Sequence, residues 1–323
     1  MNARPQAPSS GDFFDHINPK RFGVGIALLF LAALSTQVFV LNLAPVYGAL
    51  PLDLFHKEGM ALSGLAGFFL KGYVSRPTIR RALYLLPVIA FWIPTVLYFI
   101  LQIGPMFGNL PGAMLTDVLV FYPLIILTIL CSRELVHVGL RLDRYDALIA
   151  NHIPFMGLYV IYSVGYKIIH FFLSRVLGFT FLFSRAGLQL VIAALYAAAI
   201  PSKLLVLTIP SILFSIFFNV HIPLGYMTTS LNSHLNEEGF VLLERHDSTT
   251  GYLSVLENTE EKYRVMRCDH SLLGGQWTGI SNEIHPTIKE PVYAVFTMLE
   301  AVRLVQNDQG NARPDVGKKA LVM

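Results

Sequence analysis

Charged residues are scarce in this 323-residue sequence. They make up 14% of the chain, whereas hydrophobic residues make up 54% and the mean hydropathy is +0.55. An ordinary soluble domain has roughly a quarter of its residues charged, and it needs them to cover its surface. The composition therefore excludes a single soluble globular domain and predicts a lipid bilayer as the solvent for much of the chain.

Cysteine is scarce as well, and the common motifs of catalysis and metal binding are missing. Cys131 and Cys268 lie far apart and form no CxxC pair, which predicts two unpaired thiols rather than a disulfide framework. The ten histidines are scattered, so none forms a metal-binding pair at helical spacing. The sequence contains no GxSxG, Walker or GxGxxG motif. We therefore predict no catalytic residue and no metal site.

Long runs without charge fill the first two thirds of the chain. A membrane-spanning helix needs about 20 mostly apolar residues, and several segments reach or approach that length. The last segment is too long for one span, and Pro201 and Lys203 interrupt it, which indicates a helical hairpin. Together they predict a transmembrane bundle of six to eight spans over residues 23–222. The predicted segments are 24–43, 60–74, 83–103, 113–131, 153–173 and 186–220.

A polar tail, residues 1–22, precedes the first run and lacks the pattern of a cleavable signal. Lys and Arg gather before the first run, after the second and after the fourth, so the positive-inside rule places the N-terminus in the cytosol. Over residues 133–150, apolar residues recur at helical spacing with charges between them. This pattern predicts an amphipathic helix in the membrane interface, and a soluble linker helix is the alternative.

Ionisable residues inside the apolar runs are the first candidates for chemistry, because a charge in lipid is costly and often functional. Asp117 lies in the fourth run, and Lys167 and His170 lie in the fifth. An ion-coupled transporter could use such a set, but no pair of matched broken helices accompanies it. The structural alternative is that Asp117 lies near a helix end and that Lys167 extends its amine to the interface.

The pattern changes after residue 220. Residues 1–224 carry 15 Lys and Arg against 8 Asp and Glu, whereas residues 225–323 carry 9 against 13. This acidic balance argues against nucleic acid as a partner of the second part. β-favouring runs at 240–244, 252–256 and 263–268 alternate with polar turns, which predicts a β-hairpin module over residues 223–289. The sequence then predicts a helix over 290–305 and the beginning of a strand at 319–323.

Residues 244–300 carry a resemblance to a known family. The segments ERHDSTTGYLSVLEN, EKYRVMRCDHSLLGGQW and EPVYAVFTMLE together resemble the start of the spermidine/spermine synthases, which are polyamine aminopropyltransferases. That family has a β-hairpin domain, then a tyrosine-bearing helix, then a Rossmann-like domain. The resemblance implies that Tyr293 and Gln276 bind substrate. It also implies a polyamine substrate and decarboxylated S-adenosylmethionine as co-substrate.

The family's glycine-rich loop, ribose-binding acid and amine-deprotonating aspartate would lie after Met323. Residues 290–323 therefore look like the start of a truncated methyltransferase-like domain, so we expect no cofactor site and no aminopropyltransferase activity in residues 1–323 alone. The expected fold is an α-helical membrane bundle of six to eight spans, followed by a small β-hairpin module and the beginning of an α/β Rossmann-like domain.

The expected function is that of a membrane-anchored, spermidine synthase-like protein of polyamine biosynthesis. The alternative is a membrane transporter or scaffold protein with a regulatory C-terminal β module. The expected partners are the lipid bilayer, a polyamine and a second copy of the chain, without nucleic acid. The expected location is a multi-pass membrane protein whose C-terminal segment is cytosolic.

Overall fold

The computed structural model describes residues 18–48, 52–144, 147–269 and 271–278. The chain divides into two compact units. We call residues 1–227 together with 247–251 the helical unit, and residues 228–246 together with 252–323 the sheet unit.

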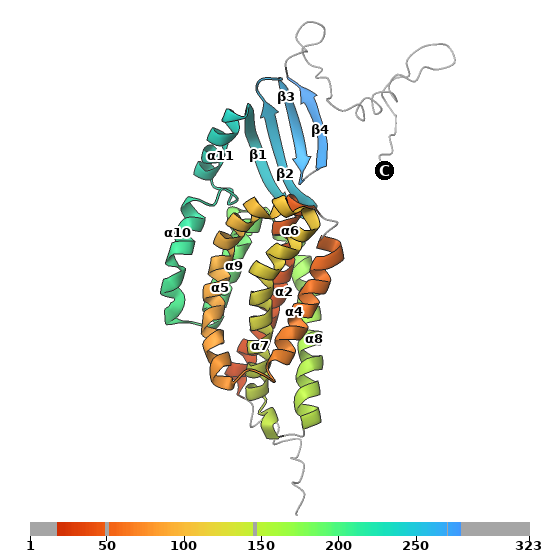
Figure 1. The fold of residues 1–323 in the computed structure, drawn as a ribbon, viewed down its shortest axis with the longest axis vertical. Coiled ribbons are helices and arrows are strands. Elements are labelled where there is room, and N and C mark those ends of the chain that lie inside the picture. The colour runs from red at the N-terminus through yellow and green to blue at the C-terminus, as the bar shows by residue number, and fades with distance from the viewer. Residues whose placement is uncertain (1–17, 49–51, 145–146, 270, 279–323) are drawn as a thin grey trace, which may run out of the picture. The chain divides into compact units, whose positions relative to one another are not determined.

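The helical unit is a bundle arranged around α2 (Pro19–Tyr47), which packs against α7 (Tyr122–Gly139), α8 (Ala147–Val176) and α9 (Arg185–Ala199) (Figure 1). Pro19 suits the first turn of α2 because its missing N–H would have no partner there. The Asn18 side chain caps the helix by accepting a hydrogen bond from the Arg21 backbone N–H. The other helices of this unit are α4 (Lys57–Leu70), α5 (Arg76–Ile103), α6 (Asn109–Thr116) and α10 (Ile209–Phe217).

Two π-helical segments lie between these helices. One, η1 (Leu52–His56), leads directly into α4, and the other, η3 (Asp117–Phe121), joins α6 to α7. A π-helical turn displaces the side chains that follow it relative to an α-helix, and such turns are frequent at functional sites.

Glycines allow the helices of the bundle to approach closely. At Gly67 of α4, an added Cβ atom would lie 2.4 Å from the carbonyl oxygen of Ile126 in α7. At Gly139 of α7, it would lie 2.9 Å from the backbone nitrogen of Phe22 in α2. Both distances are shorter than any normal contact, so only glycine fits without a shift of the backbone. Small residues of this kind are typical of closely packed apolar helices.

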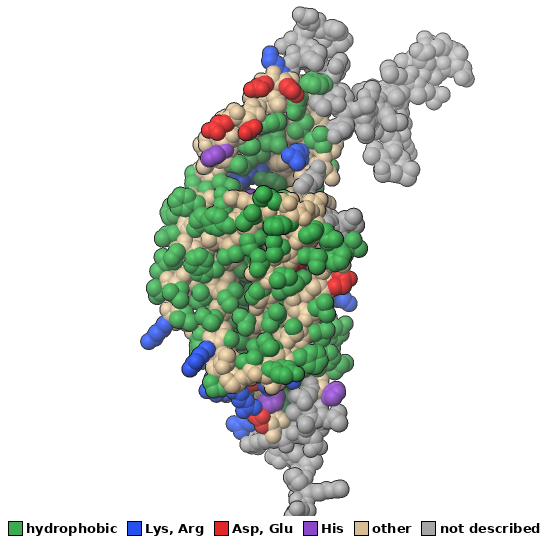
Figure 2. Space-filling model, viewed as in Figure 1, with side chains coloured by type: hydrophobic (Ala, Val, Ile, Leu, Met, Phe, Trp, Pro, Cys, Tyr) green, Lys and Arg blue, Asp and Glu red, His purple; other side chains and the backbone are tan. Residues whose placement is uncertain are grey.

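The helical unit buries polar side chains within its apolar core and exposes many large apolar side chains. Thr36, His56 and Asp117 are at most 5% exposed, whereas Leu62 and Phe172 are 65% and 60% exposed. Figure 2 shows hydrophobic side chains over most of the visible face of this unit, with Lys and Arg concentrated toward its lower end. A monomeric soluble protein rarely exposes so continuous an apolar surface.

Four helical stretches of the described residues are long and apolar enough to cross a membrane, judged by length and composition. They are Pro19–Tyr47, Arg76–Phe107, Asn109–Gly139 and Pro154–Val176. The predicted number of six to eight spans is therefore wrong for the described residues. Hydropathy detected the remaining apolar segments, but α4 and α9 have only 14 and 15 residues, and Lys203–Phe217 is equally short.

The region 133–150 also differs from the prediction. Residues 133–139 complete α7, a 3₁₀ turn covers Leu142–Arg144 (η4), and α8 begins at Ala147. The charged side chains of Arg133 and Glu134 are 8% and 7% exposed, so they face the bundle. Two of the charged residues of this region thus belong to α7, and the described part of the region does not form one separate helix.

The sheet unit contains a four-stranded sheet in the order β1-β2-β3-β4, formed by β1 (Phe240–Ser248), β2 (Gly251–Asn258), β3 (Tyr263–Cys268) and β4 (Ser271–Trp277) (Figure 1). The pairs β2–β3 and β3–β4 are antiparallel. α11 (Gly225–Glu237) precedes β1 and was not predicted. Neither was β4, because Gly274 and Gly275 interrupt its alternating pattern. The predicted helix over 290–305 and strand at 319–323 lie outside the described residues.

The Asn232 side chain joins α11 to β1 within the sheet unit. Its oxygen accepts a hydrogen bond from the Leu242 N–H at 2.8 Å, and its nitrogen donates one to the Leu242 carbonyl at 3.0 Å. One amide thus satisfies both backbone groups of an edge-strand residue, which would otherwise bond to water.

Candidate functional site

The two residues predicted to bind substrate are not both within the described part of the chain. Gln276 lies on β4, directly opposite Arg264 of β3. Tyr293 lies outside the described residues. Substrate binding by Gln276 and Tyr293 therefore stays a prediction.

A buried histidine–aspartate pair lies in the centre of the helical unit. The Nδ1 atom of His56 lies 3.0 Å from both carboxylate oxygens of Asp117, and Nε2 lies 3.3 Å from the Thr36 carbonyl oxygen. His56 is 1% exposed and Asp117 is 2% exposed. An ionisable pair that is excluded from water in this way is rare and marks a candidate functional site.

The two π-helical segments bring this pair together. His56 is the last residue of η1 and Asp117 is the first residue of η3. The two residues are 61 positions apart in the sequence. The pair therefore depends on two irregular helical turns that a regular hydrophobic pattern does not reveal.

Both ring nitrogens of His56 face oxygen atoms, those of the Asp117 side chain and that of the Thr36 carbonyl. The ring therefore connects η1 to η3 and to α2 through polar contacts.

Hydroxyl groups extend this polar centre. Tyr162 of α8 donates to Thr36 Oγ1 at 3.0 Å. Next to Asp117, Thr116 lies 2.8 Å from the Tyr47 hydroxyl. The centre thus joins α2, α6 and α8 through hydrogen bonds that cross an otherwise apolar core.

The ionisable residues that sequence analysis grouped with Asp117 do not share its environment. Lys167 and His170 are on α8, and both are exposed. The true partner, His56, lies at the end of a short segment between two apolar runs and was not predicted. The only signal in the sequence was an isolated histidine close to a predicted span, which by itself does not identify a partner.

A second polar cluster joins the end of α4, the start of α5 and the end of α7. Glu134 of α7 pairs with the Lys71 amine at 3.0 Å and with Arg76 Nε at 3.3 Å. Arg76 Nη2 also pairs with Asp143 at 2.7 Å. Burial lowers the pKa of the Lys71 amine, and its hydrogen bond to Glu134 offsets part of that effect. Partial burial raises the pKa of Asp143, but the hydrogen bond from Arg76 and nearby positive charges outweigh it and leave that pKa below its ordinary value.

No group of three or more His, Cys, Asp or Glu side chains within the described ranges could hold a metal ion. Neither Cys131 nor Cys268 forms a disulfide with a described residue.

Comparison with known proteins gives one informative result. The chain is 53% identical over 305 residues to a protein of Emericella nidulans described as an N-terminal histidine N-methyltransferase. The match covers 94% of this chain and 55% of that protein, so the chain spans about half the length of the curated relative. No protein-family model and no solved structure matches the chain.

This similarity shows that the resemblance to spermidine/spermine synthases is wrong. It also removes support for polyamine biosynthesis, for the aminopropyl-donating co-substrate, and for the alternative of a transporter or scaffold. The fold class with a Rossmann-like beginning rested on the same resemblance and is withdrawn with it. Strand alternation, polar turns and an acidic-x-x-Tyr motif describe a backbone pattern. They do not specify which chemical group an enzyme transfers.

Proposed function

We propose that this chain is part of a methyltransferase that modifies the N-terminal histidine of a protein or peptide. The observation that carries this proposal is the 53% identity, which extends over 94% of the chain and includes both units. Because the relative is about twice as long as the match, its activity extends to this chain only as a proposal.

The chemistry implies a methyl donor of the S-adenosylmethionine type. A nitrogen lone pair of the substrate attacks the methyl carbon, the carbon–sulfur bond breaks, and the sulfonium becomes a neutral thioether. The substrate nitrogen loses a proton in the same overall reaction, so a nearby base or water must accept it. We assign neither the binding of the methyl donor nor the acceptance of the proton to any described residue.

We also propose that the helical unit lies in a lipid bilayer. Its four candidate spans and its exposed leucine and phenylalanine side chains support this location. Polar groups that are paired inside an apolar exterior are expected where no water is available to satisfy them. The buried His56–Asp117 pair then serves to fix the packing of α2, η1 and η3 in the bundle.

The directions of the helices bear on how the helical unit would be oriented in the bilayer. α5 and α10 run in the same direction, because Trp92 donates to the Leu207 carbonyl while Thr95 lies 2.7 Å from Ser211 further along both helices. α2 and α5 both begin near one pocket, which Asn18 and Arg76 line. α10 therefore ends at the end of the helical unit opposite Asn18.

This path favours a location different from the one that the sequence predicts. With a cytosolic N-terminus, α10 ends on the non-cytosolic side, and we propose that the segment following it is non-cytosolic, whereas sequence analysis placed the C-terminal segment in the cytosol. A glycosylation acceptor distinguishes the two. Glu238→Thr creates an Asn-x-Thr site at the exposed Asn236, and Pro8→Asn creates an Asn-Ser-Ser site in the tail. We expect modification in the secretory pathway at Asn236 but not at position 8, and the reverse result would contradict the proposed orientation.

The activity is tested with protein expressed from the complete reading frame that encodes this chain. Membranes containing it are incubated with S-adenosylmethionine carrying a labelled methyl group and with a peptide that begins with histidine. We expect label on the N-terminal residue of that peptide. A peptide of the same sequence with an N-terminal alanine is the matched control. Equal labelling of both peptides, or of neither, would contradict the proposed substrate.

A further inference from the structure

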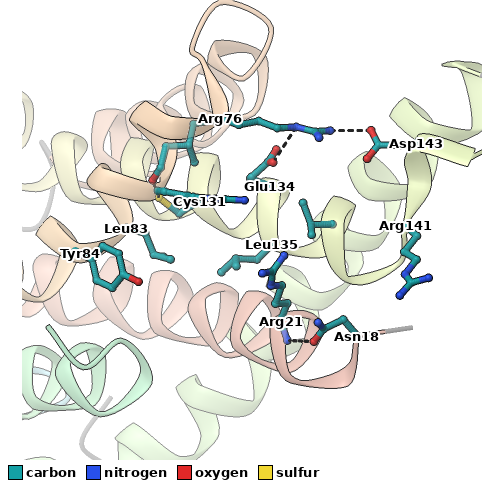
Figure 3. A pocket seen from close by; sticks show the side chains of 13 residues that line it. Asn18, Arg21, Arg76, Leu83, Tyr84, Cys131, Glu134, Leu135, Arg141 and Asp143 are labelled. Atoms are coloured by element: carbon teal, nitrogen blue, oxygen red, sulfur yellow. Dashed lines mark hydrogen bonds and ion pairs between the residues drawn. The ribbon is translucent and has the colours of Figure 1, made fainter. Parts of the chain in front are cut away.

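A pocket of 540 Å³ lies at the end of the helical unit where α2 and α5 begin and α7 ends (Figure 3). Arginine side chains line it from three directions. Arg21 comes from α2, Arg76 and Arg80 come from α5, and Arg141 comes from the turn after α7. This pocket is separate from the buried His56–Asp117 pair, neither of whose residues lines it.

Among the described residues, Arg76 is the only one of these four arginines with an ion-pair partner. Arg76 is fixed between Glu134 and Asp143, as Figure 3 shows. Arg21, Arg80 and Arg141 are exposed, and none of them forms an ion pair with another described residue. Three guanidinium groups with five N–H donors each thus surround the pocket without a carboxylate partner.

The net charge of the lining favours an anion. Four arginines face two carboxylates, those of Glu134 and Asp143, which leaves an excess of two positive charges. The N-termini of α2 and α5 add partial positive charge, which the C-terminus of α7 opposes in part. The planar guanidinium fork of arginine matches two oxygen atoms of a phosphate or a carboxylate group, so it can bind such an anion through two hydrogen bonds.

Most of the remaining wall of the pocket is apolar, with Asn18 and Tyr84 as its uncharged polar members. Leu83 and Leu135 line it together with Ile79 and Val138. A small inorganic ion makes no favourable contact with these apolar side chains. An amphiphile would place an acyl chain against them and its phosphate among the arginines. Basic pockets between membrane helices are suited to lipid head groups for this reason.

We propose that this pocket binds the phosphate group of an anionic phospholipid. Arg21, Arg80 and Arg141 contact the phosphate, while Leu83 and Leu135 contact the first part of an acyl chain. Arg76 stays bound to Glu134 and Asp143 and holds the pocket in shape. The lipid as the source of the phosphate rests on the proposed membrane location, but the pocket does not depend on methyltransferase activity.

The test uses the full chain purified in an uncharged detergent and titrated with dioctanoyl phosphatidic acid. The double variant Arg21→Gln/Arg80→Gln should bind at least about tenfold more weakly, since it loses two charge-assisted hydrogen-bonding groups. Its matched control, Lys20→Gln/Arg81→Gln, removes the same two charges from the neighbouring exposed positions, neither of which lines the pocket. The control should stay within about twofold of the parent chain. All four residues are exposed, and circular dichroism verifies that each variant is folded.

Two further ligands identify what the pocket recognises. Dioctanoyl phosphatidylcholine tests whether the acyl chains suffice, and inorganic phosphate tests whether the phosphate suffices. We expect both to bind more weakly than phosphatidic acid. Equal loss of binding in the two double variants would show nonspecific charge attraction and overturn the proposal. Phosphate binding as tightly as phosphatidic acid would overturn the lipid as ligand. Membrane extraction at alkaline pH tests the location independently, so its failure is distinguishable from failure of the pocket.

Discussion

The helical unit and the sheet unit solve the problem of polar groups in opposite ways. The helical unit buries hydroxyl, carboxylate and imidazole groups among its helices and leaves leucine and phenylalanine exposed. The sheet unit is mostly half-buried along its strands, and its ion pair Glu257–Arg264 lies at the surface. The difference indicates that polar interactions contribute most to the stability of a unit where its side chains are shielded from water.

This comparison predicts that single polar changes in the helical unit have larger effects than those in the sheet unit. A buried charge has no water to replace a lost partner, whereas a half-exposed side chain has. Hydrogen exchange measured segment by segment reports on both units in one sample, so each change below can be followed in the unit that carries it and in the other one.

The largest effect is expected from removing one member of the buried pair. Asp117→Ala leaves the buried Nδ1 atom of His56 without its partner and should destabilise the helical unit by about 3–5 kcal/mol. Thermal unfolding in detergent gives the size of the effect. Glu58→Ala, an exposed acid in α4, is the control and should change little. The double variant His56→Phe/Asp117→Leu should recover much of the loss, and failure to do so would point to a role beyond pairing.

A second change tests the close packing of α4 against α7 in the helical unit. Gly67→Leu places a side chain where even a Cβ atom would lie 2.4 Å from the Ile126 carbonyl oxygen, and α4 and α7 would have to separate. We expect a loss of about 3 kcal/mol and a broader elution profile in detergent. Gly64→Leu is the matched control, because nothing lies within 4 Å of a Cβ atom at that position of the same helix. Equal effects of both substitutions would show that α4 and α7 do not pack this closely.

A third change addresses the sheet unit alone. Asn232→Ala removes both hydrogen bonds to Leu242 and should cost about 1–2 kcal/mol, with faster hydrogen exchange in β1 and no change in α2. Asn236→Ala, at an exposed position of the same helix, should have no measurable effect. Faster exchange in α2 as well would mean that the two units unfold together.

The smallest effect is expected from the surface pair of the sheet. Arg264 donates two hydrogen bonds to Glu257 Oε2, at 2.9 and 2.6 Å, but both side chains are partly exposed. Glu257→Gln should therefore cost less than about 1 kcal/mol, and high salt should reduce the difference further. A loss as large as that of Asp117→Ala would remove the distinction drawn between the two units.

The sequence by itself determined the main apolar helices and most of the strands. The predicted segments 24–43, 83–103 and 113–131 lie within long helices, and the runs at 240–244, 252–256 and 263–268 lie within β1, β2 and β3. Length, absence of charge and alternation are local properties, so a single sequence reveals them.

Only the tertiary structure decided which polar residues meet. The sequence singled out Asp117 but assigned it Lys167 and His170 as companions, whereas the fold pairs it with His56 through two π-helical turns. It interpreted Arg133, Arg141 and Asp143 as one face of an interfacial helix, whereas the fold directs Glu134 inward and places Arg141 at a pocket with Arg21 and Arg80. These pairings join positions about 60 or more residues apart, and they depend on helix direction and close approach at glycine, neither of which a periodic pattern encodes.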